Sequence, residues 1–88
     1  MSRIVFTEKG FEDYEYWLRK DLKKIKRINQ LLKSIERDGD LQGLGKPELL
    51  KYEDGVYRRR IDEVNRMVYE IENNGDVVVK ACKGHYED

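Results

Sequence analysis

The stretch that decides the fold is residues 66–83, which read RMVYEIENNGDVVVKACK. Hydrophobic side chains recur with a period of about two on both sides of Asn74-Gly75. An Asn-Gly pair between two such runs is a strong signal for a β-hairpin, because a type I′ turn needs positive φ at both central residues. We therefore expect two antiparallel strands, Arg66 to Glu72 and Val77 to Lys83.

The two-residue turn also predicts a register, in which Tyr69 faces Lys80 and Arg66 faces Lys83. Because successive side chains of a strand point to opposite faces, His85 then lies on the same face as Arg66. His85 is the only histidine in the chain, so the end of this strand is the first candidate for a functional site.

A second hairpin precedes the first, with a strand from Gly55 to Ile61 and a loop of Asp62-Glu63-Val64. A three-residue loop sets Arg60 directly opposite Arg66. Like charges in this position destabilise a sheet, so two facing arginines indicate an anion-binding surface. The other face of the three strands is apolar and should contact the helices: Tyr57, Ile61, Met67, Tyr69, Ile71, Val78 and Cys82.

The N-terminal half predicts one short strand and two helices. The strand is Arg3 to Thr7, and Thr7 caps the first helix. The apolar stripe of that helix consists of Phe11, Tyr14, Trp17 and Leu18. Asp21 caps the second helix, in which apolar residues recur at spacings of three and four: Leu22, Ile25, Ile28, Leu31, Leu32 and Ile35. So short a connection predicts an antiparallel helical hairpin.

These elements predict an α+β fold in the order β-α-α-β-β-β, with the helical hairpin packed on one face of a small antiparallel sheet. We expect residues 1–88 to form a single domain, because a chain of 88 residues supports only one modest core.

Composition limits the class of protein. Lys plus Arg and Asp plus Glu both number 18, so net charge does not indicate a nucleic-acid partner. Basic residues nevertheless gather between Arg19 and Arg37, where a solvated helix face and a docking surface for a polyanion are both open interpretations. No apolar run approaches the roughly 18 residues of a membrane span. The lone Cys82 is interpreted as a core residue in a reducing compartment, so we expect a cytoplasmic, soluble protein.

The combination of Arg60, Arg66 and Lys83 with an imidazole suits a phosphodiester substrate. Guanidinium groups match phosphate oxygens and stay charged, and histidine can protonate a leaving 5′-oxygen near neutral pH. The base that would deprotonate a 2′-hydroxyl is missing from these strands. Glu48, in the glycine-rich loop that enters the sheet, is the nearest candidate in the sequence.

Other chemistries fit less well. One histidine and no clustered carboxylates cannot make the usual metal-ligand sets, so we expect no metal and no cofactor. Acyl transfer lacks a nucleophile, since Ser2 and Ser34 are expected to be peripheral and Cys82 lies on the apolar face. On residue types alone, a passive RNA-binding or partner-binding domain is favoured over a nuclease, because arginine clusters are far commoner than active sites.

Four motifs carry a resemblance to a known family. They are Gly45-Lys46-Pro47-Glu48, Arg58-Arg59-Arg60-Ile61, Asn65-Arg66-Met67-Val68-Tyr69 and His85-Tyr86. Together, and in this order, they resemble the YoeB/Txe toxins of bacterial type II toxin-antitoxin systems, which belong to the RelE-like superfamily. The run Asp13-Tyr14-Glu15-Tyr16-Trp17 is also similar to that family.

The resemblance implies a ribosome-dependent, metal-independent endoribonuclease that cleaves mRNA in the ribosomal A site and inhibits translation. Glu48 would be the general base and His85 the general acid, while Arg66, supported by Arg60, would stabilise the phosphorane and Tyr86 would orient the mRNA or the catalytic groups. Residues that match RNA-contacting positions are Lys46, Lys51 and Arg59.

The implied partners are mRNA, ribosomal RNA at the basic second helix, a Phd/YefM-type antitoxin and a second copy of the chain. The alternative is a non-catalytic member that binds only the ribosome or the antitoxin. Two positions depart from the family pattern: Glu87 and Asp88 follow the His-Tyr pair, and Asn65 stands where a histidine can precede the central arginine.

Overall fold

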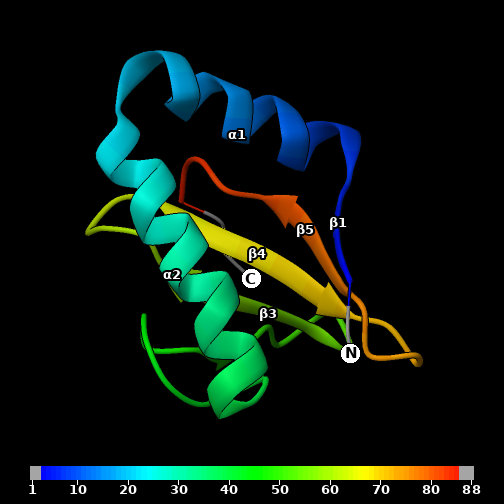
Figure 1. Cartoon of the computed structure of the whole chain (residues 1–88). Helices are drawn as coiled ribbons and strands as arrows, with labels where there is room; N and C mark the ends of the chain where they lie inside the picture. The colour runs from blue at the N-terminus through cyan, green and yellow to red at the C-terminus, as the bar shows by residue number, and fades with distance from the viewer. Residues whose placement is uncertain (1–2, 86–88) are drawn as a thin grey trace.

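The computed structural model describes residues 3–85 and has two helices on one face of a five-stranded sheet (Figure 1). The helices are α1 (Glu8–Lys20) and α2 (Leu22–Asp38). The strands are β1 (Ile4–Phe6), β2 (Glu48–Leu49), β3 (Val56–Arg60), β4 (Arg66–Ile71) and β5 (Val77–Ala81), in the spatial order β1-β5-β4-β3-β2. The α+β fold with helices on one face is confirmed.

The sheet is mixed, which corrects the expected antiparallel sheet. β1 pairs with β5 in parallel, with Val5 opposite Val78, whereas the other neighbouring strands are antiparallel. A parallel pair needs a long connection, and here most of the chain lies between the two strands. The sheet also has one strand more than predicted, because Glu48 and Leu49 pair with Arg58 and Tyr57 at its edge.

The β3–β4 hairpin has the predicted register. Arg60 lies opposite Arg66, and the Ile61 N–H donates to the Asn65 carbonyl at 3.0 Å, which closes the loop over Asp62-Glu63-Val64. The two arginines therefore start on the same face of the sheet.

The β4–β5 hairpin differs from the prediction by one residue. The Glu72 N–H donates to the Asp76 carbonyl at 2.9 Å, so the loop holds three residues, and Tyr69 lies opposite Val79 instead of Lys80. An irregularity in the pairing next to Val68 then restores the predicted partner Ala81. A β-bulge absorbs one extra residue in this way.

The three-residue loop and the bulge together decide which residues of β5 reach the core. Val77 and Val79 are buried against the helices, whereas Val78, expected in the core, pairs with Glu70 on the other face. Because the bulge adds a residue, Cys82 returns to the helix side, where it is fully buried and its pKa is raised to about 12, chiefly by desolvation. The expectation of a core cysteine is confirmed.

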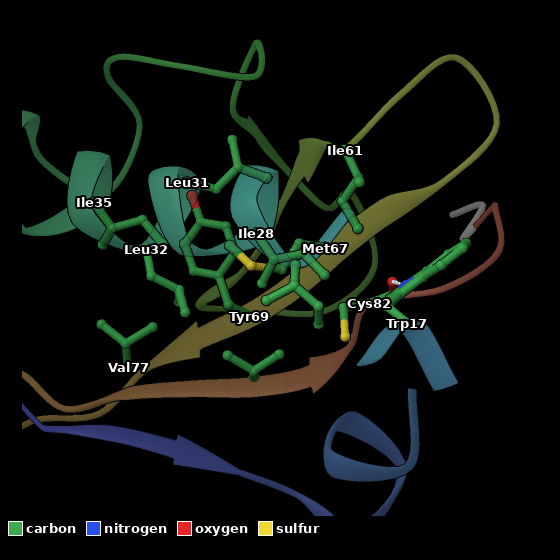
Figure 2. Packing of buried hydrophobic residues seen from close by; sticks show 12 residues of the cluster. Trp17, Ile28, Leu31, Leu32, Ile35, Ile61, Met67, Tyr69, Val77 and Cys82 are labelled. Atoms are coloured by element: carbon green, nitrogen blue, oxygen red, sulfur yellow. Dashed lines mark hydrogen bonds between the residues drawn. The ribbon is translucent and has the colours of Figure 1, made fainter. Parts of the chain in front are cut away.

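The main core lies between α2 and the central strands (Figure 2). Side chains of Ile28 and Leu31 stand over Met67 and Tyr69, and the Trp17 indole N–H donates to the Cys82 carbonyl at 2.8 Å. The buried residues are Trp17, Ile25, Ile28, Leu31, Leu32, Ile35, Ile61, Met67, Tyr69, Val77, Val79 and Cys82. Phe11, Leu18 and Leu22 were expected to face the core, but they are 51%, 49% and 67% exposed.

The two helices diverge instead of lying antiparallel (Figure 1). Asp21 alone connects them: its N–H donates to the Trp17 carbonyl at 2.8 Å, and its carboxylate accepts the Lys23 N–H at 3.0 Å. Because one residue both ends α1 and caps α2, no loop is left in which the chain could reverse direction and place the helices antiparallel. α1 therefore covers β5 while α2 covers the central strands.

Gly10 sets how closely α1 approaches β5. A Cβ atom at this position would lie 2.2 Å from the Val79 carbonyl oxygen, closer than any real contact. The first turn of α1 is anchored at the same place, because the Thr7 N–H donates to that carbonyl and the Thr7 hydroxyl accepts the Gly10 N–H.

Gly10→Ala should therefore destabilise the chain. Alanine normally stabilises a helix interior by about 1 kcal/mol over glycine, but here the methyl group must push α1 away from β5, which costs about 1–3 kcal/mol. Urea unfolding measures the change, with Glu12→Ala on the exposed side of the same helix as control. A more stable Gly10→Ala variant would contradict the close packing.

Candidate active site

The face of the sheet away from the helices carries the candidate residues. One row runs across four strands and contains Glu48, Arg58, Val68 and Ala81. Arg60 and Arg66 form a neighbouring row. The middle of this face is apolar, because Leu50, Val56, Val68 and Ala81 form a second small buried cluster. Charged groups thus lie beside an apolar cluster on a face that neither helix covers.

Glu48 is held by an arginine that the sequence analysis did not single out. The Arg58 Nη2 atom lies 2.9 Å from the Glu48 Oε2 atom, and the Glu48 side chain is 50% exposed. The pair forms because β2 places the two residues directly opposite each other. A two-residue strand leaves no periodic pattern, so only the paired sheet reveals this contact.

Arg66 is turned towards its own loop. Its Nη1 atom donates to the carbonyls of Asp62 at 2.8 Å, Glu63 at 3.2 Å and Asn65 at 3.2 Å. The residue is only 8% exposed, so these contacts fix the guanidinium at the edge of the open face. Arg60 is exposed, and its backbone N–H donates to the Gly45 carbonyl at 2.7 Å.

The segment that carries His85 lies against β4. The Gly84 N–H donates to the Asn65 Oδ1 atom at 2.8 Å, and the Gly84 carbonyl accepts the Arg66 N–H at 2.9 Å. His85 is exposed and directly follows these contacts. The structure thus brings the backbone beside His85 to Arg66, whereas Tyr86 lies outside the described residues.

The lysines are distributed differently from the expectation. Lys46 and Lys51 are exposed on the segments before and after β2. Lys83 was expected beside the arginines, but its ammonium nitrogen lies 4.3 Å from the ring centroid of Tyr16 on α1. The chain bends at Lys83 after the end of β5, and this lysine makes a cation–π contact on the helix side.

The structure corrects the expectation that Arg59 contacts RNA. It has no exposed surface, so it cannot touch RNA in this structure. Its guanidinium donates to the Tyr69 hydroxyl at 2.8 Å, to Ser34 at 3.1 Å and to four backbone carbonyls, those of Gly39, Asp40, Gln42 and Leu44. Ser34, expected to be peripheral, is fully buried in this network.

Some basic side chains of α2 bind other parts of the chain, and others are exposed to solvent. Lys24 forms an ion pair with Asp62 at 2.8 Å, and the Arg27 Nη2 atom donates to the Arg60 carbonyl at 3.3 Å. These two bind α2 to the β3–β4 hairpin. Lys23, Lys26 and Lys33 are exposed and remain available for an external partner.

Comparison with known proteins identifies the family. A family model described as "YoeB-like toxin of bacterial type II toxin-antitoxin system" matches residues 6–86. The chain belongs to this family. Toxin YoeB of Streptomyces coelicolor is 46% identical over 96% of this chain and 99% of the relative. Toxin YoeB of Escherichia coli K12 is 36% identical over 96% of this chain and 99% of the relative.

Solved structures agree with this YoeB-like assignment. The YoeB dimer from Staphylococcus aureus superimposes with a TM-score of 0.90 at 45% identity and covers 97% of this chain and 98% of that chain. The heterotetrameric YoeB-YefM toxin-antitoxin complex from the same organism has a TM-score of 0.87 at 46% identity, over 98% and 99% of the two chains.

Residues 3–85 of this YoeB-like chain contain neither a candidate metal site nor a candidate membrane-spanning helix. No group of three or more His, Cys, Asp or Glu side chains could hold a metal ion there. Neither helix of that part combines the length and apolar character that crossing a membrane requires.

Replacing Arg59 in this YoeB-like chain should be costly. Arg59→Met leaves buried carbonyls and the Tyr69 hydroxyl without their donor, so we expect the free energy of unfolding to fall by about 3 kcal/mol or more. Arg60→Met is the matched control, since its exposed side chain should change stability by no more than about 0.5 kcal/mol. Equal unfolding midpoints for the two variants would contradict the structural role of Arg59.

The stability of the toxin should depend on pH through Asp62. Partial burial raises the pKa of its carboxyl, but hydrogen bonds from Lys24, from the Asn65 amide and from the backbone of Val64 and Asn65 outweigh burial and hold the pKa well below its ordinary value. Asp62 therefore stabilises the fold above the ordinary aspartate pKa of about 3.9, and this contribution is lost as pH falls through the lower folded-state pKa.

Asp62→Asn should consequently be less stable than the wild type at pH 7, with the difference shrinking below about pH 4. Urea unfolding of both proteins between pH 7 and pH 3 measures it, and Asp54→Asn at an exposed position is the control. A difference that stays constant over this range would show that the Asp62 charge contributes nothing.

Proposed function

We propose that this YoeB-like toxin is a metal-independent, ribosome-dependent endoribonuclease that cleaves mRNA in the ribosomal A site. The observation that carries the proposal is the open face of the sheet. There, Glu48 in β2 and Arg60 and Arg66 in adjacent strands occupy neighbouring rows, and the segment before His85 is bonded to Arg66. A carboxylate can serve as the general base, guanidinium groups can stabilise the developing charge and an imidazole can serve as the general acid in cleavage by an adjacent 2′-hydroxyl.

The reaction needs one proton removed and one supplied. Glu48 takes the proton of the 2′-hydroxyl, whose oxygen forms a bond to the adjacent phosphorus. Arg66 and Arg60 stabilise the extra negative charge of the phosphorane. As the bond from phosphorus to the 5′-oxygen breaks, protonated His85 gives its proton to that oxygen. The products are a 2′,3′-cyclic phosphate, which water can open to a 3′-phosphate, and a 5′-hydroxyl.

The neighbours of these groups fit the same role. Arg58 adds a further cation beside Glu48, and a phosphate that attracts Arg58 would compete for the ion pair and free the carboxylate. Lys46 and Lys51 lie exposed near β2, where they can contact the RNA backbone. Tyr86 completes the proposed set by orienting the mRNA or the catalytic groups.

The proposed partners follow from the relatives and from charge. The S. aureus structures are a YoeB dimer and a YoeB-YefM complex, which supports a homodimer and a Phd/YefM-type antitoxin for this chain. The exposed lysines of α2 would meet ribosomal RNA, since polyanions attract such a face. These partners imply a cytoplasmic protein.

Expression of the wild-type chain should arrest growth, and Glu48→Gln and His85→Gln should each relieve the arrest. Loss of a general acid or base typically lowers the rate by about 10²–10⁴-fold. Primer extension on translated messages measures cuts inside A-site codons, and Glu12→Gln, on the exposed side of α1, is the carboxylate control that should stay toxic.

Two results would refute this function. Undiminished toxicity in both Glu48→Gln and His85→Gln would exclude the proposed catalytic groups. Growth arrest and ribosome binding without any cuts would identify the chain as a non-catalytic binder, which is the competing function.

A further inference from the structure

The β3–β4 loop contains a closed set of hydrogen bonds. The Asp62 Oδ1 atom accepts the backbone N–H groups of Val64 at 2.8 Å and Asn65 at 2.7 Å. The Asn65 side-chain amide donates to both Asp62 carboxylate oxygens, at 3.2 Å and 3.0 Å. The loop therefore keeps its shape through its own contacts.

Asp62 also decides which way the Asn65 amide points. An ionised carboxylate only accepts hydrogen bonds, so the Asn65 nitrogen must face it and the Asn65 oxygen must face away. That oxygen accepts the Gly84 N–H at 2.8 Å. The Asn65 side chain thus connects the β3–β4 loop to the segment that follows β5.

Gly84 is held on both of its backbone groups by consecutive residues. Asn65 accepts from its N–H, and the Arg66 N–H donates to its carbonyl at 2.9 Å. Gly84 has a φ of +91°, a conformation that residues with a side chain rarely adopt, so the chain turns at this point. His85 is the next residue, and its backbone leaves from a position that Asn65 and Arg66 determine.

The same loop positions the guanidinium of Arg66. The carbonyls of Asp62, Glu63 and Asn65 accept from the Arg66 Nη1 atom. Lys24 on α2 then ties the loop to the helical layer through its 2.8 Å ion pair with Asp62. One loop therefore holds both the arginine and the backbone beside the histidine.

We propose that Asn65 is a positioning residue, which aligns His85 with Arg66 by joining the Asp62 carboxylate to the Gly84 backbone. This inference rests on the proposed function. In this role Asn65 acts on the rate through its hydrogen bond to Gly84 and not by contact with the reacting atoms. Effective alignment of reacting groups is worth large factors in rate, so a looser strand end slows the chemical step more than it weakens binding.

The test uses two variants of the full chain. Asn65→Asp keeps an acceptor for the Gly84 N–H but replaces the donor to Asp62 with a second carboxylate, and the two like charges repel. The double variant Asp62→Asn with Asn65→Asp exchanges the two groups. The new amide at position 62 can donate to the new carboxylate at position 65, which still accepts the Gly84 N–H.

Two measurements read the effect. The rate of single-turnover cleavage on programmed ribosomes at saturating toxin should fall by about ten-fold in Asn65→Asp. The toxin concentration that gives the half-maximal rate should change little. In the double variant the cleavage rate should rise again by at least about three-fold over that of Asn65→Asp. Amide hydrogen exchange, followed by NMR in a His85→Gln background to limit toxicity, should show loss of protection at Gly84 in Asn65→Asp and its return in the double variant. Protection at Met67 and Val79 controls for overall destabilisation.

The outcomes separate this inference from the function on which it rests. If the Asn65→Asp variant cleaves at the rate of the wild type, the positioning role is wrong. It is also wrong if the Gly84 amide loses no more protection than the Met67 and Val79 amides do. If the wild type makes no cuts, the proposed function is refuted and the positioning role with it, while hydrogen exchange at Gly84 still reports whether the contact exists.

Discussion

Much of this molecule depends on one buried cation. Arg59 has no exposed surface and forms no ion pair among the described residues, yet a buried charge without hydrogen bonds would cost several kcal/mol. The chain after α2 bends around the guanidinium, so that the carbonyls of Gly39, Asp40, Gln42 and Leu44 accept its hydrogen bonds. This determines where the chain enters β2, and so where Glu48 lies. Ser34 and Tyr69 extend the network into α2 and β4.

The candidate site is assembled from three separate parts of the chain, each held in place by contacts with its neighbours. Glu48 stands in an edge strand of two residues, Arg66 is held by loop carbonyls, and His85 follows a segment bonded to β4. Both helices pack on the opposite face, so their core supports these segments without covering them. The result is a rigid support for an exposed surface, which suits a ligand as large as RNA better than a closed pocket does.

Predictions from the sequence were correct for features that depend on neighbouring residues. They were wrong for features that depend on how distant segments pack together. The caps at Thr7 and Asp21 are local, and both form as predicted. The loop at Asn74-Gly75 was predicted to hold two residues, but it holds three. With this longer loop and the bulge beside Val68, Val77 and Val79 are buried instead of Val78. Arg59 was mistaken for an RNA contact, since three consecutive arginines look alike until strand alternation and the loop at residues 39–44 bury the middle one.

By itself, the sequence determined both helices, four of the five strands, the α+β class and the register that sets Arg60 against Arg66, because periodicity and short turns are properties of neighbouring residues. The motifs also predicted the family that the comparisons then showed. Only the tertiary structure decided the parallel pairing of β1, the divergence of the helices, the Arg58 contact with Glu48 and the link from Asn65 to Gly84. Each of these joins groups whose meeting depends on how whole elements pack, and no local pattern in the chain encodes that packing.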